Sequence, residues 1–225
     1  MQNKLSDCLD KNYKLAIFDM DGTILNTLED LADSANYTLK TYGMPQRTIE
    51  EIRKFVGNGI RRLLEQAVPN EISKELLEEM TVTFSSYYKE HCSNKTCAYE
   101  GIIEVLKEIR NKGIITAVVS NKADFGVQIL CEEYFTGLFD FSVGEKQGIR
   151  RKPYPDSVLS VIDKFKISKN DVVYIGDSEV DLKTAVNAGI DVIMVGWGFR
   201  DEEYLKKCGA PFVINKPIDI MNFFR

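Results

Sequence analysis

Five short apolar segments, rich in Val, Ile and Phe, constrain the fold of this chain more than any other feature of its sequence. They are LAIF at 15–18, ITAVV at 115–119, FDFSV at 139–143, VVYI at 172–175 and VIMV at 192–195. Each run is continuous and not alternating, which is typical of strands buried on both faces of a parallel sheet. Segments with apolar residues at helical spacing separate the later runs. One of them is 101–113, where Gly113 is the expected end of the helix. The pattern predicts a doubly wound, mainly parallel α/β sheet.

The stretch from about 28 to 92 breaks this alternation, because it shows helical periodicity without a convincing strand. Three glycine- or proline-containing turns divide it, GMP at 43–45, GNG at 57–59 and VPN at 68–70. We therefore expect an inserted α-helical cap domain at 25–92 and a core domain formed by 1–24 and 93–225. Because the insertion begins a few residues after Asp21, its connections to the core must pass close to the end of the first strand. We therefore expect the helices to form a lid above that end.

Composition limits the classes of partner. A chain of 225 residues with a formal charge of -5 lacks the broad basic surface that nucleic acid or an anionic membrane would require. The first fifteen residues lack the apolar core of a secretory signal, and no apolar run is long enough to cross a bilayer. We expect a cytoplasmic protein with no nucleic-acid or membrane partner; the sequence leaves its oligomeric state open.

The cysteines do not resemble a disulfide framework, because their number is odd and they are widely spread: Cys8, Cys92, Cys97, Cys131 and Cys208. His91, Cys92 and Cys97 lie close in sequence, but the two-residue spacing of zinc-binding cysteines is missing and no second cluster follows. We expect reduced thiols, no zinc, and an exposed polar role for His91.

Polar residues follow three of the predicted strands. Asp19 and Asp21 come after the first strand, Ser120 and Asn121 after the second, and Asp177, with Asp181 one helical turn later, after VVYIG. Lys152 stands before a proline in RRKPYPD, ahead of another predicted helix. Because ligands of open α/β sheets bind beyond the carboxyl ends of the strands, we expect these groups to converge there.

Carboxylates gathered in one cleft repel one another and so favour a bound cation. Carboxylate oxygens without nearby His or Cys select Mg²⁺, with Asp19 and Asp177 as expected ligands. A small phosphate monoester would then be attracted to Mg²⁺, Lys152 and the Ser120 hydroxyl. Asp19 could attack phosphorus, while Asp21 protonates the leaving oxygen and later deprotonates water.

The ordered set DMDGT, VVSNK, RRKPYPD and GDSEVD resembles the four motifs of the haloacid dehalogenase superfamily of phosphohydrolases, over residues 15 to about 195. The resemblance implies a Rossmann-like core and an aspartyl-phosphate intermediate on Asp19. It implies that Asp21 acts as the general acid and general base and that its backbone carbonyl ligates Mg²⁺. The remaining implied roles are substrate binding by Thr23, Ser120, Asn121 and Lys152, with Ser120 and Lys152 on the phosphoryl group and Thr23 as a hydrogen-bond support. Asp177 would ligate the metal, and Asp181 would do so directly or through water.

The predicted cap resembles that of the phosphoglycolate phosphatase branch. The turn Gly57 and Asn58, followed by Arg61 and Arg62, could offer backbone donors and positive charge to an anionic leaving group. The same residues could instead be an ordinary turn and a solvated helix face. Asn26 departs from the aspartate often found at that place in the branch.

Other activities are disfavoured or stay open. Asp21 disfavours a dehalogenase, because the dehalogenase motif lacks this second carboxylate. The lone His91 disfavours a sugar phosphomutase, and the lack of a Schiff-base lysine pattern disfavours a phosphonatase. A pyrophosphatase, nucleotidase or sugar phosphatase, or a non-catalytic binding protein, remains open. We expect Trp197 to pack at the core edge and the tail at 211–225 to contribute only packing or surface.

Overall fold

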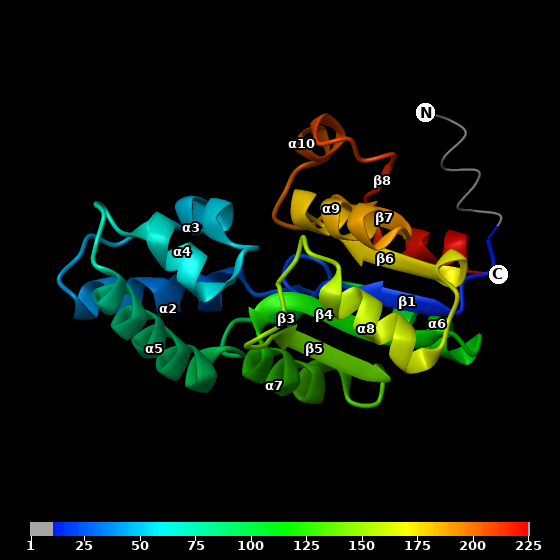
Figure 1. The fold of residues 1–225 in the computed structure, drawn as a ribbon, viewed down its shortest axis with the longest axis horizontal. Helices are drawn as coiled ribbons and strands as arrows, with labels where there is room; N and C mark the ends of the chain where they lie inside the picture. Colours follow the sequence, from blue (N-terminus) through cyan, green and yellow to red (C-terminus); the bar gives the residue numbers. More distant parts are fainter. Residues whose placement is uncertain (1–10, 225) are drawn as a thin grey trace.

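A computed structural model of the chain describes residues 11–224, so Cys8 and the other terminal residues lie outside the described part. One sheet dominates the fold (Figure 1). Its strands are β1 (Leu15–Phe18), β4 (Ile115–Ala123), β5 (Phe141–Glu145), β6 (Val172–Gly176), β7 (Asp191–Val195) and β8 (Val213–Ile214). They pair in the order β5-β4-β1-β6-β7-β8, and every pairing is parallel. The predicted doubly wound α/β sheet is confirmed.

Each face of the sheet is covered by its own helices. The helical elements of the core are α6 (Ile102–Asn111), α7 (Asp124–Phe135), α8 (Asp156–Phe165), η1 (Lys169–Asp171), α9 (Glu179–Ala188), α10 (Glu202–Lys207) and η2 (Pro217–Phe223). On β1, Ala16 and Phe18 pack in the cluster that includes α6, α7 and η2, whereas Leu15 and Ile17 pack in the cluster that includes α8, α9 and α10. All four side chains are fully buried, which explains the continuous apolar run.

Three strands differ from the sequence-based expectation. β5 begins at Phe141, two residues later than predicted, because Phe139 packs edge-on against Phe18 and Phe135 in the core instead of joining the sheet. β4 continues through Ser120 and Asn121, which we expected to follow it, across a register irregularity between Val119 and Ala123. β8, two residues long, was missed because so short a run carries no periodic signal.

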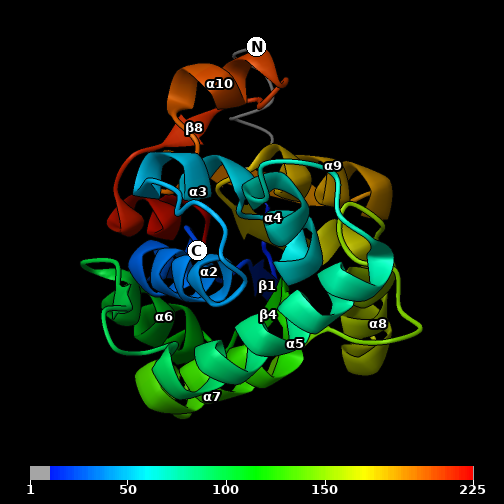
Figure 2. The ribbon, with the colours of Figure 1, turned by 90° about the vertical axis from the view of Figure 1, so that its left-hand side faces the viewer.

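The segment between β1 and β4 contains helices α2 (Leu28–Thr41), α3 (Ile49–Phe55), α4 (Gly59–Ala67) and α5 (Lys74–His91). These helices pack on one another and lie beyond the carboxyl end of β1, as Figures 1 and 2 show. A two-stranded antiparallel pair, β2 (Leu25–Asn26) with β3 (Cys97–Ala98), joins the two connections to the sheet.

Local signals explain where two of these helices start. Thr48 and Glu51 form a capping box at α3, in which the Thr48 hydroxyl accepts from the Glu51 backbone N–H and the Glu51 carboxylate accepts from the Thr48 backbone N–H. At α5, the Ser73 hydroxyl accepts from the backbone N–H of Leu76.

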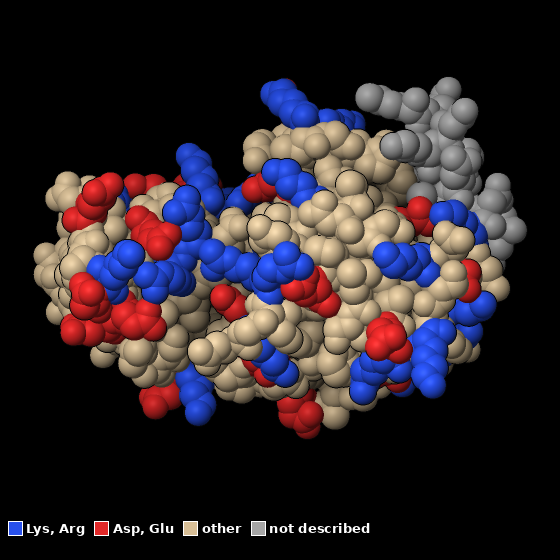
Figure 3. Space-filling model, in the orientation of Figure 1, with Lys and Arg blue, Asp and Glu red and all other residues tan. Residues whose placement is uncertain are grey.

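The visible surface carries charges of both signs. Figure 3 shows lysines, arginines, aspartates and glutamates interspersed over the helices α2 to α5 and over the sheet, with no single basic area on this face. Within residues 11–224, no helix combines the length and the apolar composition that a membrane span requires.

Candidate active site

The carboxyl ends of β1 and β6 bring three carboxylates together. Asp19 directly follows β1, and its backbone N–H donates to Ile175 O of β6 at 2.9 Å, which continues the sheet pairing by one residue. Asp177 follows β6, and Asp181 lies in the first turn of α9. Each of the three offers an oxygen, and these atoms all lie within 4.8 Å of one another. The convergence expected from the sequence is therefore present.

Lys152 lies inside this acidic cluster. Its ammonium Nζ is 2.9 Å from Asp19 Oδ1 and 2.7 Å from Asp181 Oδ1, and it donates to Tyr174 Oη at 2.9 Å. Burial alone would lower the pKa of Lys152, but the Asp181 and Asp19 charges outweigh it and hold that pKa well above its ordinary value. The lysine is a fixed positive charge beside Asp19.

Asn121 holds Lys152 in place through its backbone. The Asn121 side chain accepts from the Lys152 backbone N–H at 2.8 Å and donates to the Lys152 carbonyl at 3.0 Å. It also donates to the carbonyl of Gly57, in the turn before α4, at 3.0 Å. We predicted Asn121 to bind substrate; in this structure its amide positions Lys152 and links the sheet to the helical segment.

Lys152 by itself does not balance the three carboxylates. Burial, followed by the Asp181 charge, raises the pKa of Asp19 to about 7, although Lys152 acts in the opposite direction. Burial and the charges of Asp181 and Asp19 likewise hold the pKa of Asp177 well above its ordinary value. A divalent cation would supply the missing charge, and an all-oxygen donor set suits a hard ion such as Mg²⁺.

Asp181 is almost fully engaged by protein groups. Its Oδ1 faces Lys152 and Tyr174, while its Oδ2 accepts from the Ser178 backbone N–H at 3.0 Å and from the Ser178 hydroxyl at 2.6 Å. Asp181 thus completes a capping box at α9 and neutralises Lys152. This arrangement favours indirect over direct contact with a cation.

Asp177 is held by the loop after β1 and the loop after β7. The Thr23 hydroxyl donates to Asp177 Oδ1 at 3.2 Å, and the Phe199 backbone N–H donates to Oδ2 at 2.8 Å. A Cβ atom on Gly22, whose φ is +81°, would collide with the same carboxylate. Thr23, predicted to be near substrate, is fully buried against Asp177.

Trp197 also contributes to this support. Its indole N–H donates to the carbonyl of Thr23 at 3.0 Å. We expected only packing at the core edge for Trp197; its hydrogen bond holds the loop that carries Thr23.

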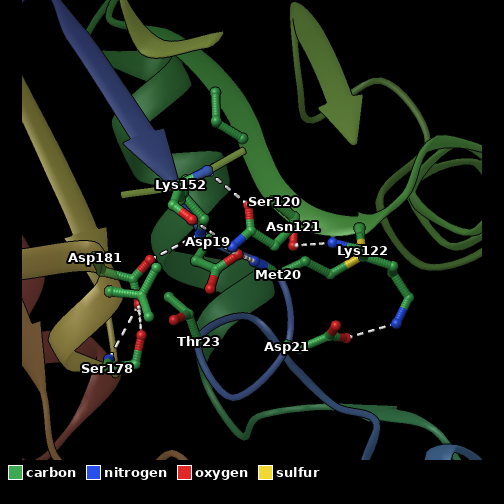
Figure 4. Close-up of polar contacts among 12 residues, drawn as sticks. Asp19, Met20, Asp21, Thr23, Ser120, Asn121, Lys122, Lys152, Ser178 and Asp181 are labelled. Atoms are coloured by element: carbon green, nitrogen blue, oxygen red, sulfur yellow. Dashed lines mark hydrogen bonds and ion pairs between the residues drawn. The ribbon is translucent and has the colours of Figure 1, made fainter. Parts of the chain in front are cut away.

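Asp21 belongs to a second cluster beside the first. Its Oδ1 accepts from Lys122 Nζ at 2.7 Å and from the Thr27 hydroxyl at 2.7 Å. Figure 4 shows the two clusters, Lys152 with Asp19 and Asp181 on one side and Lys122 with Asp21 on the other. Two neighbouring aspartates therefore have different partners, which permits different chemical roles.

A cavity opens over both clusters. Its wall on the sheet side contains Asp19, Asp21, Ser120, Asn121, Lys122, Ala123, Asp177, Ser178, Phe199 and Arg200. Its wall on the helical side contains Leu31, Val56, Gly57, Gly59, Ile60, Leu63 and Tyr88. The Ser120 hydroxyl accepts from the Lys122 backbone N–H at 3.3 Å, which leaves its own proton to be donated into the cavity.

Part of the predicted leaving-group site lies elsewhere. Gly57 lines the cavity, but Asn58 and Arg61 are not among its lining residues. Arg61 donates to Glu78 at 2.7 Å and Arg62 to Glu65 at 2.9 Å, so both arginines are neutralised on the helical surface. This outcome agrees with the alternative of an ordinary turn followed by a solvated face.

Several lining residues were not anticipated from the sequence, among them Tyr88, Lys122, Phe199 and Arg200. Lys122 directly follows Ser120 and Asn121, so a charged residue at the end of a buried strand was an available signal. No sequence signal pointed to Arg200. Its guanidinium pairs with Glu179 at 3.3 Å and reaches across the cavity to donate to the carbonyls of Arg53 at 2.9 Å and Val56 at 3.1 Å.

The histidine and cysteine cluster shows ordinary contacts. The His91 ring packs at a tilt of 39° against the Tyr87 ring, and its Nδ1 forms a hydrogen bond of 3.1 Å with the Asn94 side-chain amide. Cys92, Cys97, Cys131 and Cys208 are free thiols. Among residues 11–224, the group with metal-binding geometry is the acidic one at Asp19, Asp177 and Asp181.

Comparison with known proteins identifies the family. The model of the haloacid dehalogenase-like hydrolases matches residues 16–195. The chain belongs to this family. It is 31% identical over 200 residues to the phosphoglycolate phosphatase of Mannheimia succiniciproducens, covering 85% of this chain and 89% of that protein. It is 32% identical over 195 residues to that of Psychrobacter arcticus, covering 83% of this chain and 85% of that protein.

Solved structures agree over the same length. A crystal structure from Lactobacillus delbrueckii subsp. bulgaricus superposes with a TM-score of 0.86 at 38% identity, covering 93% of this chain and 97% of the other. The crystal structure of a predicted phosphoglycolate phosphatase from Haemophilus somnus gives a TM-score of 0.87 at 28% identity, covering 93% and 96%. The haloacid dehalogenase-like fold therefore extends over nearly the whole chain.

Proposed function

We propose that this protein is an Mg²⁺-dependent phosphatase that hydrolyses small phosphate monoesters through an aspartyl-phosphate intermediate. One observation carries the proposal: a buried aspartate at the end of the central strand lies 2.9 Å from a buried lysine, within a cluster of carboxylates that lacks balancing charge. Membership of the haloacid dehalogenase-like hydrolases supports it.

Asp19, Asp177 and the backbone carbonyl of Asp21 would hold the cation. The donor set fits, because three buried carboxylates carry more negative charge than Lys152 alone can balance. When bound, the cation supplies charge compensation for the phosphoryl oxygens, as phosphoryl transfer requires. Asp181, already engaged by Lys152 and Ser178, would act through water.

The first half of the reaction follows from the two aspartate clusters. The Asp19 carboxylate attacks phosphorus, the bond from phosphorus to the leaving oxygen breaks, and Asp21 donates its proton to that oxygen. Lys152 and the Ser120 hydroxyl bind phosphoryl oxygens, and the Thr27 and Lys122 contacts hold Asp21 in place.

In the second half, Asp21 accepts a proton from water, whose oxygen attacks the phosphorus of the acyl phosphate. The bond between phosphorus and Asp19 breaks, inorganic phosphate leaves, and the Asp19 carboxylate is restored. The helical residues 25–92 would act as a cap that excludes bulk water while the reactive acyl phosphate exists.

The names of the relatives suggest 2-phosphoglycolate as the substrate to assay first. The decisive experiment measures p-nitrophenyl phosphate hydrolysis with Mg²⁺ and with EDTA. We expect turnover with Mg²⁺ and loss of turnover with EDTA that added Mg²⁺ restores. No hydrolysis of any phosphate monoester by well-folded protein would instead support a binding protein.

A further inference from the structure

The Tyr88 hydroxyl is the first sign of an additional ligand contact. Tyr88 comes from α5, lines the cavity and is 1% exposed. Its hydroxyl has no hydrogen-bond acceptor among residues 11–224, because the Lys122 ammonium that lies beside it is itself a donor. Burial raises the pKa of Tyr88, so the hydroxyl keeps its proton and remains a donor. Because buried polar groups are nearly always hydrogen-bonded, a donor without an acceptor at a cavity wall points to a ligand.

Lys122 supplies a second donor on the opposite wall. Its side chain is 3% exposed, and its Nζ lies 2.7 Å from Asp21 Oδ1 and 4.8 Å from the centre of the Tyr88 ring. An opposite charge at this distance favours the charged form of the buried ammonium. An ammonium has three N–H donors, and the Asp21 bond occupies one of them.

The rest of the leaving-group side offers little polar recognition. Leu31, Val56, Ile60 and Leu63 are apolar. The Arg200 guanidinium uses three of its five N–H donors for Glu179 and two backbone carbonyls, which fix it against the helical wall. Arg61 and Arg62 are paired with glutamates outside the cavity lining. Specific recognition of a polar leaving group therefore falls to Tyr88 and Lys122.

We propose that the Tyr88 hydroxyl and the Lys122 ammonium together bind a carboxylate carried by the leaving group, so that these two residues determine substrate specificity. This inference rests on the proposed phosphatase function. Both groups are donors and one is cationic, which suits a group composed only of acceptor oxygens.

The position of Lys122 also limits the length of the substrate. Lys122 bonds the same Asp21 that would protonate the leaving oxygen, so the carboxylate must lie within a few bonds of that oxygen. The substrate class is thus a short phosphate monoester that carries a carboxylate, and 2-phosphoglycolate, the substrate suggested by the names of the relatives, meets this requirement. Because Tyr88 belongs to α5 and Lys122 to β4, both parts of the molecule must be together for the carboxylate to bind.

Tyr88→Phe tests the hydroxyl and leaves the ring in place. We would measure kcat/KM for 2-phosphoglycolate and for ethyl phosphate, which lacks the carboxylate. Loss of one hydrogen bond to a charged group should reduce the ratio of the two values about tenfold. Tyr87→Phe is the matched control, since Tyr87 stacks on Tyr37, packs at a tilt against His91 and is not among the residues that line the cavity. The ratio of this variant should equal that of the wild type.

Lys122→Met is the second variant, and it removes the positive charge. Because Asp21 loses a partner, both substrates should be hydrolysed more slowly, but the ratio should fall about a hundredfold, with partial recovery in Lys122→Arg. As a readout independent of turnover, calorimetric titration of an Asp19→Asn background with 2-phosphoglycolate should show weaker binding once Tyr88→Phe is added.

The outcomes separate this inference from the proposed function. If wild-type protein hydrolyses no ester, the proposed function fails and the inference fails with it. If it hydrolyses ethyl phosphate or 2-hydroxyethyl phosphate as efficiently as 2-phosphoglycolate, or if Tyr88→Phe and Lys122→Met leave the ratio unaltered, the phosphatase stands and the carboxylate site is rejected.

Discussion

The two walls of the cavity differ in how they are built. The sheet wall carries almost all of the charge, and hydrogen bonds and ion pairs at the ends of buried strands hold its groups, as for Asp19 beside Lys152 and for Asn121. The helical wall is mostly apolar, as at Ile60 and Leu63. Reaction chemistry depends on preorganised charge, which rigid strand ends provide, whereas shape and recognition can be supplied by helices.

Few polar contacts join the two walls. Asn121 donates to the Gly57 carbonyl, and Arg200 donates to the carbonyls of Arg53 and Val56. All of these acceptors are backbone atoms of the turn and helix before α4. The comparison predicts that changes in the sheet wall abolish chemistry, while changes in the helical wall alter substrate binding and local stability.

Asp19→Asn should give the largest effect. An amide cannot form the acyl phosphate, so kcat for p-nitrophenyl phosphate should fall by about a thousandfold or more, measured by phosphate release. Removing one charge from a crowded acidic cluster should leave the melting temperature at least as high as in the wild type. A variant that keeps a tenth of the wild-type rate would contradict covalent catalysis by Asp19.

Lys152→Met should be the most destabilising change on the sheet side of the site, directly behind the sheet wall. It removes a buried cation and leaves Asp19 and Asp181 without their partner, which typically costs about 3–5 kcal/mol. The free energy of unfolding in urea, followed by circular dichroism, measures this cost.

Lys146→Met provides the comparison for Lys152→Met. Lys146 pairs with Asp124 at the surface and has a side chain that is 47% exposed, so its loss should cost about 1 kcal/mol or less. Equal costs for the two variants would mean that the buried charges are not coupled as described.

Cation binding should stabilise the sheet wall. At a Mg²⁺ concentration of about 100 times Kd, the free energy of unfolding should rise by about 2.7 kcal/mol, seen as a higher melting temperature. Asp177→Asn should remove most of this rise. If Asp177→Asn responds to Mg²⁺ like the wild type, the cation binds at other groups.

Leu63→Ala should give the smallest effect on chemistry. Leu63 is 3% exposed in the helical wall, so truncation should reduce stability by about 2 kcal/mol, at the low end for buried leucines because one side of it faces the cavity. We expect KM for 2-phosphoglycolate to rise and kcat to change by less than about threefold. A large loss of kcat with an unaltered KM would contradict the division between the two walls.

Much of the fold was readable from local patterns. The runs at 15–18 and 172–175 became β1 and β6, and the polar residues after them converge, because strand ends in a parallel sheet share one edge. Errors arose where tertiary packing overrode the pattern, as for Phe139, which is apolar and aromatic but packs beside the sheet.

For the candidate site, the sequence determined which carboxylates and which lysine follow which strands, and this order led to the prediction of a cation and a phosphoryl group as ligands. Only the tertiary structure decided how the helical wall meets that chemistry. Tyr88 reaches the cavity from α5, Lys122 turns to Asp21, and Arg61 turns away to Glu78. The physical reason is the separation in sequence of the interacting residues. The geometry at the end of a strand is set locally and is the same for each parallel strand. The partner of a long side chain depends instead on which residues distant in sequence lie within a few ångströms.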